Sequence, residues 1–104
     1  MFKIGIIAYS SKILSYYGTA TALSAARYDL AAASVGNYAL FGGGYTGAVS
    51  DVVDAYDTSL VRTAPTALSA ARYALAAASV GNYALFGGGY TTTYSAVVDV
   101  YQYK

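Results

Sequence analysis

The chain has 104 residues and a formal net charge of +1, with 57% hydrophobic but only 11% charged residues, against roughly 25% charged in an average soluble domain. It contains no Cys, His, Trp or Glu, which excludes disulfides, zinc–thiolate sites, histidine bases and cysteine nucleophiles within the chain. The near-neutral charge gives no electrostatic support for nucleic-acid binding. A surface this poor in charge predicts membrane insertion, aggregation or burial against other copies of the chain.

Membrane insertion is the least favoured of these three. Residues 73–98 carry no charge, but glycines interrupt them at Gly81 and at residues 87–89, and most of the rest is Ala, Ser, Thr and Tyr. That composition is weak for a span through lipid. The apolar run at residues 4–8 is too short for a signal peptide. We therefore expect no membrane insertion and no export signal.

The strongest feature is an internal repeat. Residues 21–45 and 66–90 are identical except that Asp29 of the first block is replaced by Ala74 in the second, at an offset of 45 residues. A fixed period of 40–50 residues is typical of propellers and solenoids, in which one unit buries its face only by stacking on neighbours. We divide the chain into an N-terminal segment (residues 1–20), a first repeat (21–65) and a second repeat (66–104).

Each repeat predicts four short strands. In the first repeat they follow in chain order at residues 28–35, 37–41, 52–56 and 60–63. Gly36-Asn37 suits a two-residue hairpin turn between the first two, because both residues tolerate positive φ. Propensity alone offers an alternative, an Ala-rich helix over residues 24–34. The helix leaves the Gly-Asn turn and the repeated triple glycine less well explained.

The order of these residues resembles the kelch repeat of β-propellers. The first copy has Arg27, the strand 38–41, Gly42-Gly43, and then Val53 through Tyr56-Asp57; the second has Arg72, 83–86, Gly87-Gly88, and Val98 through Tyr101. The likeness is strongest to low-charge repeats of bacterial and phage-associated proteins. It implies four-stranded blades with the first strand innermost. The location stays open, since the cytoplasm and a phage particle both fit a chain without an export signal. The Trp usual in the fourth kelch strand is missing, since Leu60-Val61 stands there.

Two blades do not close a ring, because propellers typically need four to eight. The second repeat reaches Lys104 after its third predicted strand, whereas residues 13–17 match a fourth strand ahead of the first repeat. We expect residues 13–17 of one chain to complete the second repeat of the next, closing a head-to-tail ring without exposed sheet edges. A six-bladed trimer is the first choice; a dimer, a tetramer and a fragment of a longer propeller stay open. Residues 2–9 add an apolar segment that serves as a remnant strand or a cap.

The chain offers little for catalysis. The glycine-rich residues 42–47 lack the Lys that follows in a phosphate-binding P-loop, so a strand-end turn is expected there. Asp54 and Asp99 recur at equivalent positions and are expected to pair with Arg27 and Arg72 or to bond turn amides. We expect no catalytic residue, no metal site, no cofactor and no enzymatic activity.

The loops at one end of the strands are the candidate ligand-binding face. Tyr and Arg are large amphipathic residues that recognise partners well. The alternative is that the tyrosines pack between blades and the arginines are structural. The chain is therefore interpreted as a non-enzymatic self-assembling scaffold, or as a binding module, lectin-like or phage receptor-binding, for protein or glycan. The candidate ligand-binding residues are Tyr45, Thr46, Tyr90, Thr91, Tyr94, Arg27 and Arg72.

Overall fold

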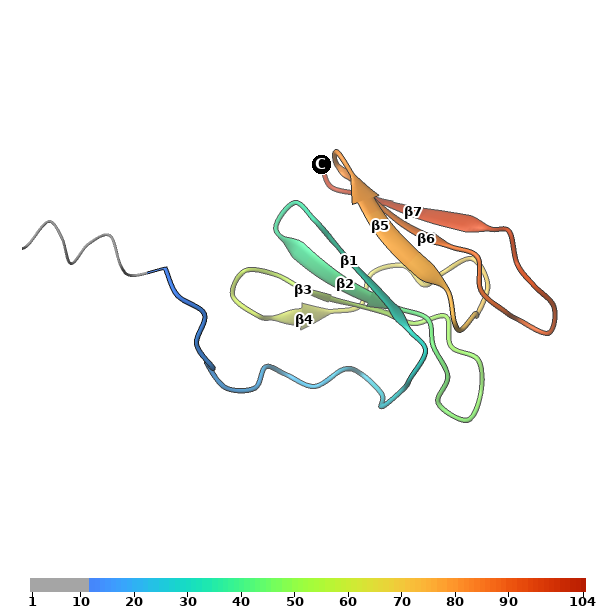
Figure 1. Cartoon of the computed structure of the whole chain (residues 1–104), viewed down its shortest axis with the longest axis horizontal. Coiled ribbons are helices and arrows are strands. Elements are labelled where there is room, and N and C mark those ends of the chain that lie inside the picture. The colour runs from blue at the N-terminus through green and yellow to red at the C-terminus, as the bar shows by residue number, and fades with distance from the viewer. Residues whose placement is uncertain (1–11) are drawn as a thin grey trace, which may run out of the picture.

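A computed structural model of the chain describes residues 12–104 (Figure 1). These residues form two antiparallel sheets and no helix, so the all-β prediction is confirmed and the helix over residues 24–34 is wrong. Sheet 1 has the strand order β1-β2-β3-β4 and sheet 2 the order β5-β6-β7. The strands are β1 (Ala31–Val35), β2 (Tyr38–Gly42), β3 (Val53–Tyr56), β4 (Arg62–Thr63), β5 (Ala76–Val80), β6 (Tyr83–Gly87) and β7 (Val98–Gln102). The described part of a single chain is an open pair of sheets and not a closed ring. It contains no apolar helix of membrane-spanning length.

The hairpin turn predicted at Gly36-Asn37 is present. Val35 pairs with Tyr38, which leaves two residues in the turn. Gly36 has a φ of 56°, whereas Asn37 is not among the positive-φ residues. A positive φ at the first central position alone is the pattern of a type II′ turn, which matches the twist of a hairpin and requires glycine there.

Three strands are shorter than predicted: β3 lacks only Val52, whereas β1 and β4 lose more. β1 begins at Ala31 and not at Tyr28, because Asp29 adopts a left-handed φ of 56° that interrupts the extended chain. Tyr28 makes only an isolated bridge. β4 is limited to Arg62–Thr63 because Leu60, with a φ of 63°, belongs to a turn, and there the Asp57 carboxylate accepts the N–H groups of Ser59 and Val61.

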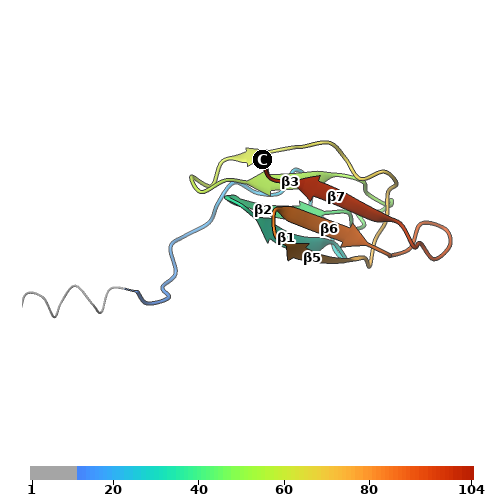
Figure 2. The ribbon, with the colours of Figure 1, turned by 90° about the horizontal axis from the view of Figure 1, so that it is seen from above.

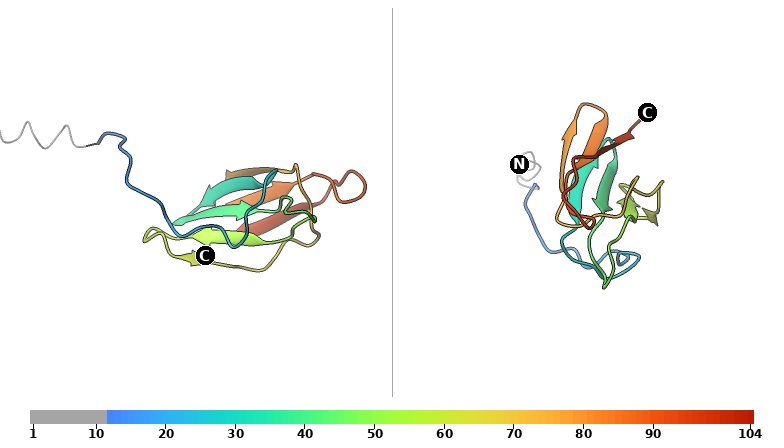
Figure 3. Two further views of the ribbon diagram at one scale, coloured as in Figure 1. Left: turned by 90° about the horizontal axis from the view of Figure 1, so that it is seen from below. Right: turned by 90° about the vertical axis from the view of Figure 1, so that its right-hand side faces the viewer.

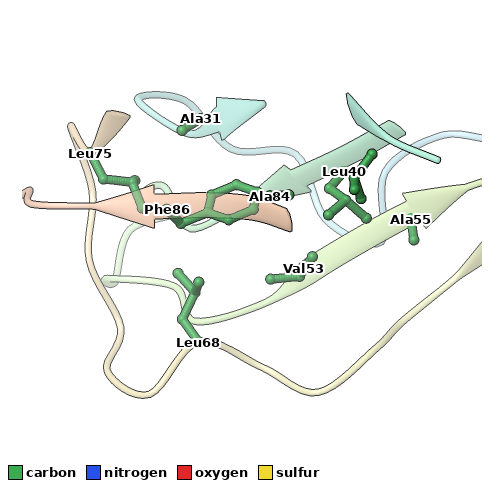
Figure 4. Packing of buried hydrophobic residues seen from close by; sticks show 9 residues of the cluster. Ala31, Leu40, Val53, Ala55, Leu68, Leu75, Ala84 and Phe86 are labelled. Atoms are coloured by element: carbon green, nitrogen blue, oxygen red, sulfur yellow. The ribbon is translucent and has the colours of Figure 1, made fainter. Parts of the chain in front are cut away.

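The two sheets pack against each other through one apolar cluster (Figure 4). Their first strands, β1 and β5, lie side by side (Figure 2). Alternate residues of sheet 1 face the contact, as the pleat requires. Sheet 2 contributes residues from β6 and from the segment before β5. The buried members are Ala31, Val35, Leu40, Val53 and Ala55 of sheet 1, and Leu68, Leu75, Ala84 and Phe86 of the second repeat.

The triple glycine after β2 lets the backbones of the two repeats meet. Gly43 has a φ of 73°, and a Cβ atom there would lie 2.7 Å from the Arg72 carbonyl oxygen and 2.8 Å from a Leu75 methyl carbon. The N–H of Gly44 donates to that same carbonyl at 2.8 Å. Any side chain at Gly43 would therefore push the sheets apart.

Residues 12–20 form no strand in the single chain. All nine are exposed and run away from both sheets (Figures 1 and 3). The strand predicted for residues 13–17 is thus unformed here, and its pairing with a neighbouring chain stays a prediction. The apolar segment predicted at residues 2–9 lies outside the described residues.

The single difference between the duplicated blocks predicts a stabilising substitution. Ala74 has a φ of 57°, close to that of its counterpart Asp29. Left-handed backbone is costly for alanine but accessible to Asn and Asp. Ala74→Asn should raise the free energy of unfolding by about 0.5–1 kcal/mol. Thermal unfolding measures this, with Ala78→Asn in β5 as the control; an equal gain in the control would contradict the explanation.

Candidate binding surface

Five tyrosine rings form a continuous row across both repeats. Within the first repeat, Tyr28 and Tyr45 exchange backbone hydrogen bonds of 3.1 and 2.8 Å, and their ring centroids are 5.7 Å apart. Tyr73 and Tyr90 repeat this arrangement, also at 5.7 Å. The Tyr45 and Tyr73 rings meet across the two repeats at 5.4 Å, and Tyr94 extends the row from Tyr90 at 5.5 Å. We call Tyr28, Tyr45, Tyr73, Tyr90 and Tyr94 the tyrosine row.

The row borders an open depression of about 530 Å³. The two ends of the tyrosine row are the most accessible, since Tyr28 and Tyr94 are exposed while the three inner tyrosines are half-buried. Edge-to-face rings present both π faces and hydroxyl groups, which suits contact with an amphipathic ligand. The depression is lined by Ala26, Arg27, Tyr28, Tyr45, Thr46 and Gly47.

The two candidate arginines lie beneath this surface. The side chains of Arg27 and Asp54 are both fully buried, with Nη2 3.1 Å from Oδ2. The same Nη2 donates to the Phe41 carbonyl at 3.1 Å, which ties the loop before β1 to the end of β2. The N–H and hydroxyl of Ser24 also donate to Asp54. The predicted pairing of Arg27 with Asp54 is confirmed.

The second repeat holds an equivalent ion pair. Arg72 is fully buried, and its Nη1 lies 2.8 Å from Oδ2 of Asp99 while its Nη2 donates to the Phe86 carbonyl at 2.9 Å. Burial raises the pKa of Asp99, but hydrogen bonds from Arg72 and Ser69 outweigh it, so the net pKa lies below the ordinary 3.8. Burial, with help from the Asp99 charge, raises the pKa of the Tyr101 phenol to about 12, and its hydroxyl donates to the Thr66 carbonyl.

The seven candidate ligand-binding residues therefore separate into two sets. Tyr45, Tyr90 and Tyr94 belong to the tyrosine row, and Thr46 lines the depression beside it. Thr91 lies in the loop after Tyr90, where its hydroxyl accepts the Thr93 N–H at 3.4 Å. Arg27 and Arg72 are committed to buried ion pairs and hold the loops in place. Ligand binding by the first set stays a prediction.

Sequence reasoning missed Tyr28 and Tyr73. The predicted first strand, residues 28–35, begins at Tyr28, and Tyr73 is the counterpart of Tyr28 in the second repeat. In the structure each of the two stands just before a left-handed residue and bridges to a loop tyrosine. Their recurrence 17 residues before Tyr45 and Tyr90 was the available signal.

A second cleft of about 530 Å³ opens at the opposite end of the strands. There Tyr103 covers the β1–β2 turn of the first repeat: a Cβ atom on Gly36 would lie within 2.5 Å of its ring, and its hydroxyl lies 3.3 Å from Asn37 Nδ2. Among the described residues, none lies within 4 Å of a Cβ atom on Gly81, so the corresponding turn of the second repeat is uncovered by residues 12–104.

The two repeats differ most in which face is covered. Sheet 1 buries one of its faces against the second repeat. The equivalent residues of sheet 2, 45 positions later in the sequence, are exposed, and we call the face that they form the sheet 2 outer face. Repetition of the sequence cannot explain this difference, so it arises from what each sheet packs against. The buried and exposed counterparts are Val35 and Val80 (7% and 61% exposed), Val53 and Val98 (1% and 56%), and Ala55 and Val100 (3% and 53%).

The converse holds on the other side of sheet 1. Residues equivalent to the buried Leu68, Leu75, Ala84 and Phe86 are only half-buried, and we call them the sheet 1 outer face. The sheet 2 outer face thus carries equivalents of the residues that sheet 1 contributes to the internal contact. The sheet 1 outer face carries equivalents of the residues that the second repeat contributes to it. The sheet 1 outer face consists of Leu23, Leu30, Ala39 and Phe41.

Comparison with known proteins adds no family assignment. The chain matches no protein-family model, and a search of curated proteins finds no match. Within residues 12–104, no three His, Cys, Asp or Glu side chains gather as metal ligands.

The Arg72–Asp99 pair generates a prediction on stability and pH. Asp99→Asn leaves a buried guanidinium without its counter-charge and should lower the free energy of unfolding by about 3 kcal/mol at neutral pH. Asp51→Asn removes the charge of an exposed aspartate and serves as the control. It should change the free energy of unfolding by no more than about 0.5 kcal/mol. Denaturant unfolding measures both variants.

The same pair sets the direction of the pH dependence. Because the pKa of Asp99 is depressed in the folded state, its stabilisation is present above the ordinary pKa of 3.8 and is lost as the pH falls through the lower folded value. The stability gap between the parent chain and Asp99→Asn should therefore close in acid. A gap that stayed constant from pH 7 to about pH 2 would contradict this assignment.

Proposed function

We propose that the chain is a non-enzymatic self-assembling scaffold, a kelch-like β-propeller built from head-to-tail copies. The observation that carries the proposal is the pair of complementary outer faces. The sheet 2 outer face repeats the residues that sheet 1 buries against the second repeat, and the sheet 1 outer face repeats the residues that the second repeat buries in return. Docking one face on the other copies a contact that already exists inside the chain.

Backbone groups support the same docking. Four hydrogen bonds join the repeats within one chain: Leu68 N–H to Asp51, Arg72 N–H to Ser50, Ala74 N–H to Asp29 and Gly44 N–H to Arg72. The equivalent bonds between copies follow when 45 is subtracted from each second-repeat residue number and added to each first-repeat residue number. Leu23, Arg27 and Asp29 of one copy would donate to Ala96, Ser95 and Ala74 of its neighbour, and the neighbour's Gly89 would donate to Arg27.

Space for this approach is present in the second repeat. Gly88 has the same left-handed backbone as Gly43, with a φ of 74°, but of residues 12–104 a Cβ atom there would meet only the Ser95 carbonyl, at 3.8 Å. The room that Leu68 and Leu75 fill beside Gly43 is therefore empty beside Gly88. Leu23 and Leu30 of a docked copy are the side chains that fit it.

Low charge supports assembly as well. Large apolar side chains exposed on one face are rare in a soluble monomer unless a partner covers them. A heterologous contact that repeats around an axis closes into a ring. With two units per chain, three chains give six blades, within the usual range of four to eight.

Native mass spectrometry tests the assembly. The parent chain should give a discrete species of several copies, with three as the first expectation. Val98→Lys on the sheet 2 outer face should give single chains, whereas Val61→Lys, at an equally exposed valine in the β3–β4 turn, should leave the assembly intact. A parent chain found only as a monomer would refute the proposal.

Complementation separates loss of docking from loss of folding. Leu23→Lys alters the opposite outer face and should also give single chains. A mixture of Val98→Lys and Leu23→Lys chains keeps one intact face of each kind, so it should form dimers and nothing larger. Absence of those dimers, when both variants unfold cooperatively, would count against face-to-face docking.

The tyrosine row supports a second function, recognition of a glycan at the loop face. The row combines accessible aromatic faces with the Thr46 hydroxyl beside an open depression, and it carries no free charge. Aromatic rings bind the apolar faces of sugars while hydroxyl groups satisfy the sugar's polar edge.

Glycan-array screening of the parent chain tests this second function. A glycan that binds should lose about tenfold or more in affinity with Tyr45→Ala, the loss of a central aromatic contact. Tyr83→Ala, at an exposed tyrosine outside the row, should bind as the parent does. Equal loss in both variants, or no bound glycan, would refute it.

A further inference from the structure

The outer edge of β7 is an unpaired sheet edge in the described chain. β7 pairs with β6 on one side, and none of residues 12–104 forms a strand on the other. In sheet 1 the equivalent edge, that of β3, is covered by β4. Exposed edges present rows of free N–H and C=O groups that bind further strands.

Side chains beside the β7 edge are more exposed than their counterparts beside β3, where a fourth strand is present. The Asp54 side chain next to β4 is fully buried, whereas its counterpart Asp99 is 18% exposed. Tyr56 is buried, whereas its counterpart Tyr101 is only half-buried. Tyr56 donates its hydroxyl to the Thr21 carbonyl as Tyr101 does to Thr66. The second repeat therefore has the ion pair and the tyrosine hydrogen bond of the first, but lacks the cover that β4 supplies.

The exposed N-terminal segment matches the position of β4 in the repeat. β4 lies just before the second repeat in the sequence, and it belongs to sheet 1, the sheet on which the second repeat packs. The residues 45 positions before Arg62 and Thr63 are Tyr17 and Gly18. These two residues precede the first repeat in the same way. They belong in a sheet docked on the sheet 1 outer face, which is the side of sheet 1 away from its own sheet 2.

We propose that residues 16–18 of one copy add as a fourth antiparallel strand to β7 of the neighbouring copy. This inference rests on the proposed head-to-tail docking and specifies how the chains are joined. Ala55 pairs with Thr63 and Tyr56 with Arg62, and the Asp57 N–H donates to the Val61 carbonyl at 3.2 Å. The corresponding pairs between copies are Val100 with Gly18, Tyr101 with Tyr17, and Gln102 with Tyr16.

Backbone pairing carries this joint. Arg62 approaches Asp54 Oδ1 at 3.9 Å and donates to the Ala22 carbonyl, and Tyr17 cannot reproduce that charge. Strand addition does not need it, because main-chain hydrogen bonds supply the affinity and side chains the register. Tyr16 and Tyr17, both exposed in the single chain, would gain an apolar neighbour in β7.

Cysteine cross-linking tests the register, because the chain has no cysteine of its own. Gln102→Cys and Tyr16→Cys chains are mixed in denaturant, refolded together and oxidised. Directly opposed residues lie about 5 Å apart between Cα atoms, within disulfide reach. Lys12→Cys replaces Tyr16→Cys in the control, since a shift of four residues moves the thiol by about 13 Å. The Gln102–Tyr16 disulfide, identified by mass spectrometry, should exceed the Gln102–Lys12 disulfide by about tenfold.

The outcomes separate this inference from the proposed function. A selective Gln102–Tyr16 cross-link between chains supports strand addition. An assembly of several copies with equal cross-linking in both mixtures overturns strand addition and leaves face docking standing. Single chains without a selective cross-link overturn both. A Gln102→Cys/Tyr16→Cys double variant that cross-links within single chains overturns exchange between copies.

Discussion

The close approach of the Gly43–Gly44 backbone to the Arg72 carbonyl is the contact on which the two-sheet arrangement depends. It depends on Gly43, which has no side chain to meet that carbonyl, and on Gly44, whose φ of 106° favours glycine. The approach places Leu68 and Leu75 beside Gly43. The Arg72 carbonyl stands where it does because the guanidinium of the same residue is anchored by Asp99 and the Phe86 carbonyl. A buried charge on one repeat therefore positions a backbone group that the preceding repeat needs.

A sheet of three or four short strands has two faces, and its own chain supplies little to cover them. In this chain the loop that carries the arginine covers part of one face, and the next repeat covers the other. The proposed docking of further copies on the two outer faces would account for the low charge of the sequence. The same constraint explains why valines on β7 are exposed while identical or smaller residues on β3 are not.

Much of the local structure could be predicted from the sequence. The period of 45 residues located both sheets, the Gly36-Asn37 turn set the β1–β2 register, and recurrence at Asp54 and Asp99 indicated the ion pairs. The start of β1 could not be predicted, since left-handed backbone at Asp29 and Ala74 is a tertiary effect that propensity does not encode. The tyrosine row was also hidden, because Tyr45 meets Tyr73 only when two repeats pack.

The tyrosine row gives the chain a spectroscopic signal that depends on how its repeats are joined. Each repeat contributes one pair of rings, and a neighbouring repeat links pair to pair through a single contact, that of Tyr45 with Tyr73. With no tryptophan in the chain, near-ultraviolet optical activity comes mainly from tyrosines held in such asymmetric contacts. Part of that signal therefore comes from the Tyr45–Tyr73 contact between repeats, and each further junction of the same kind would add to it.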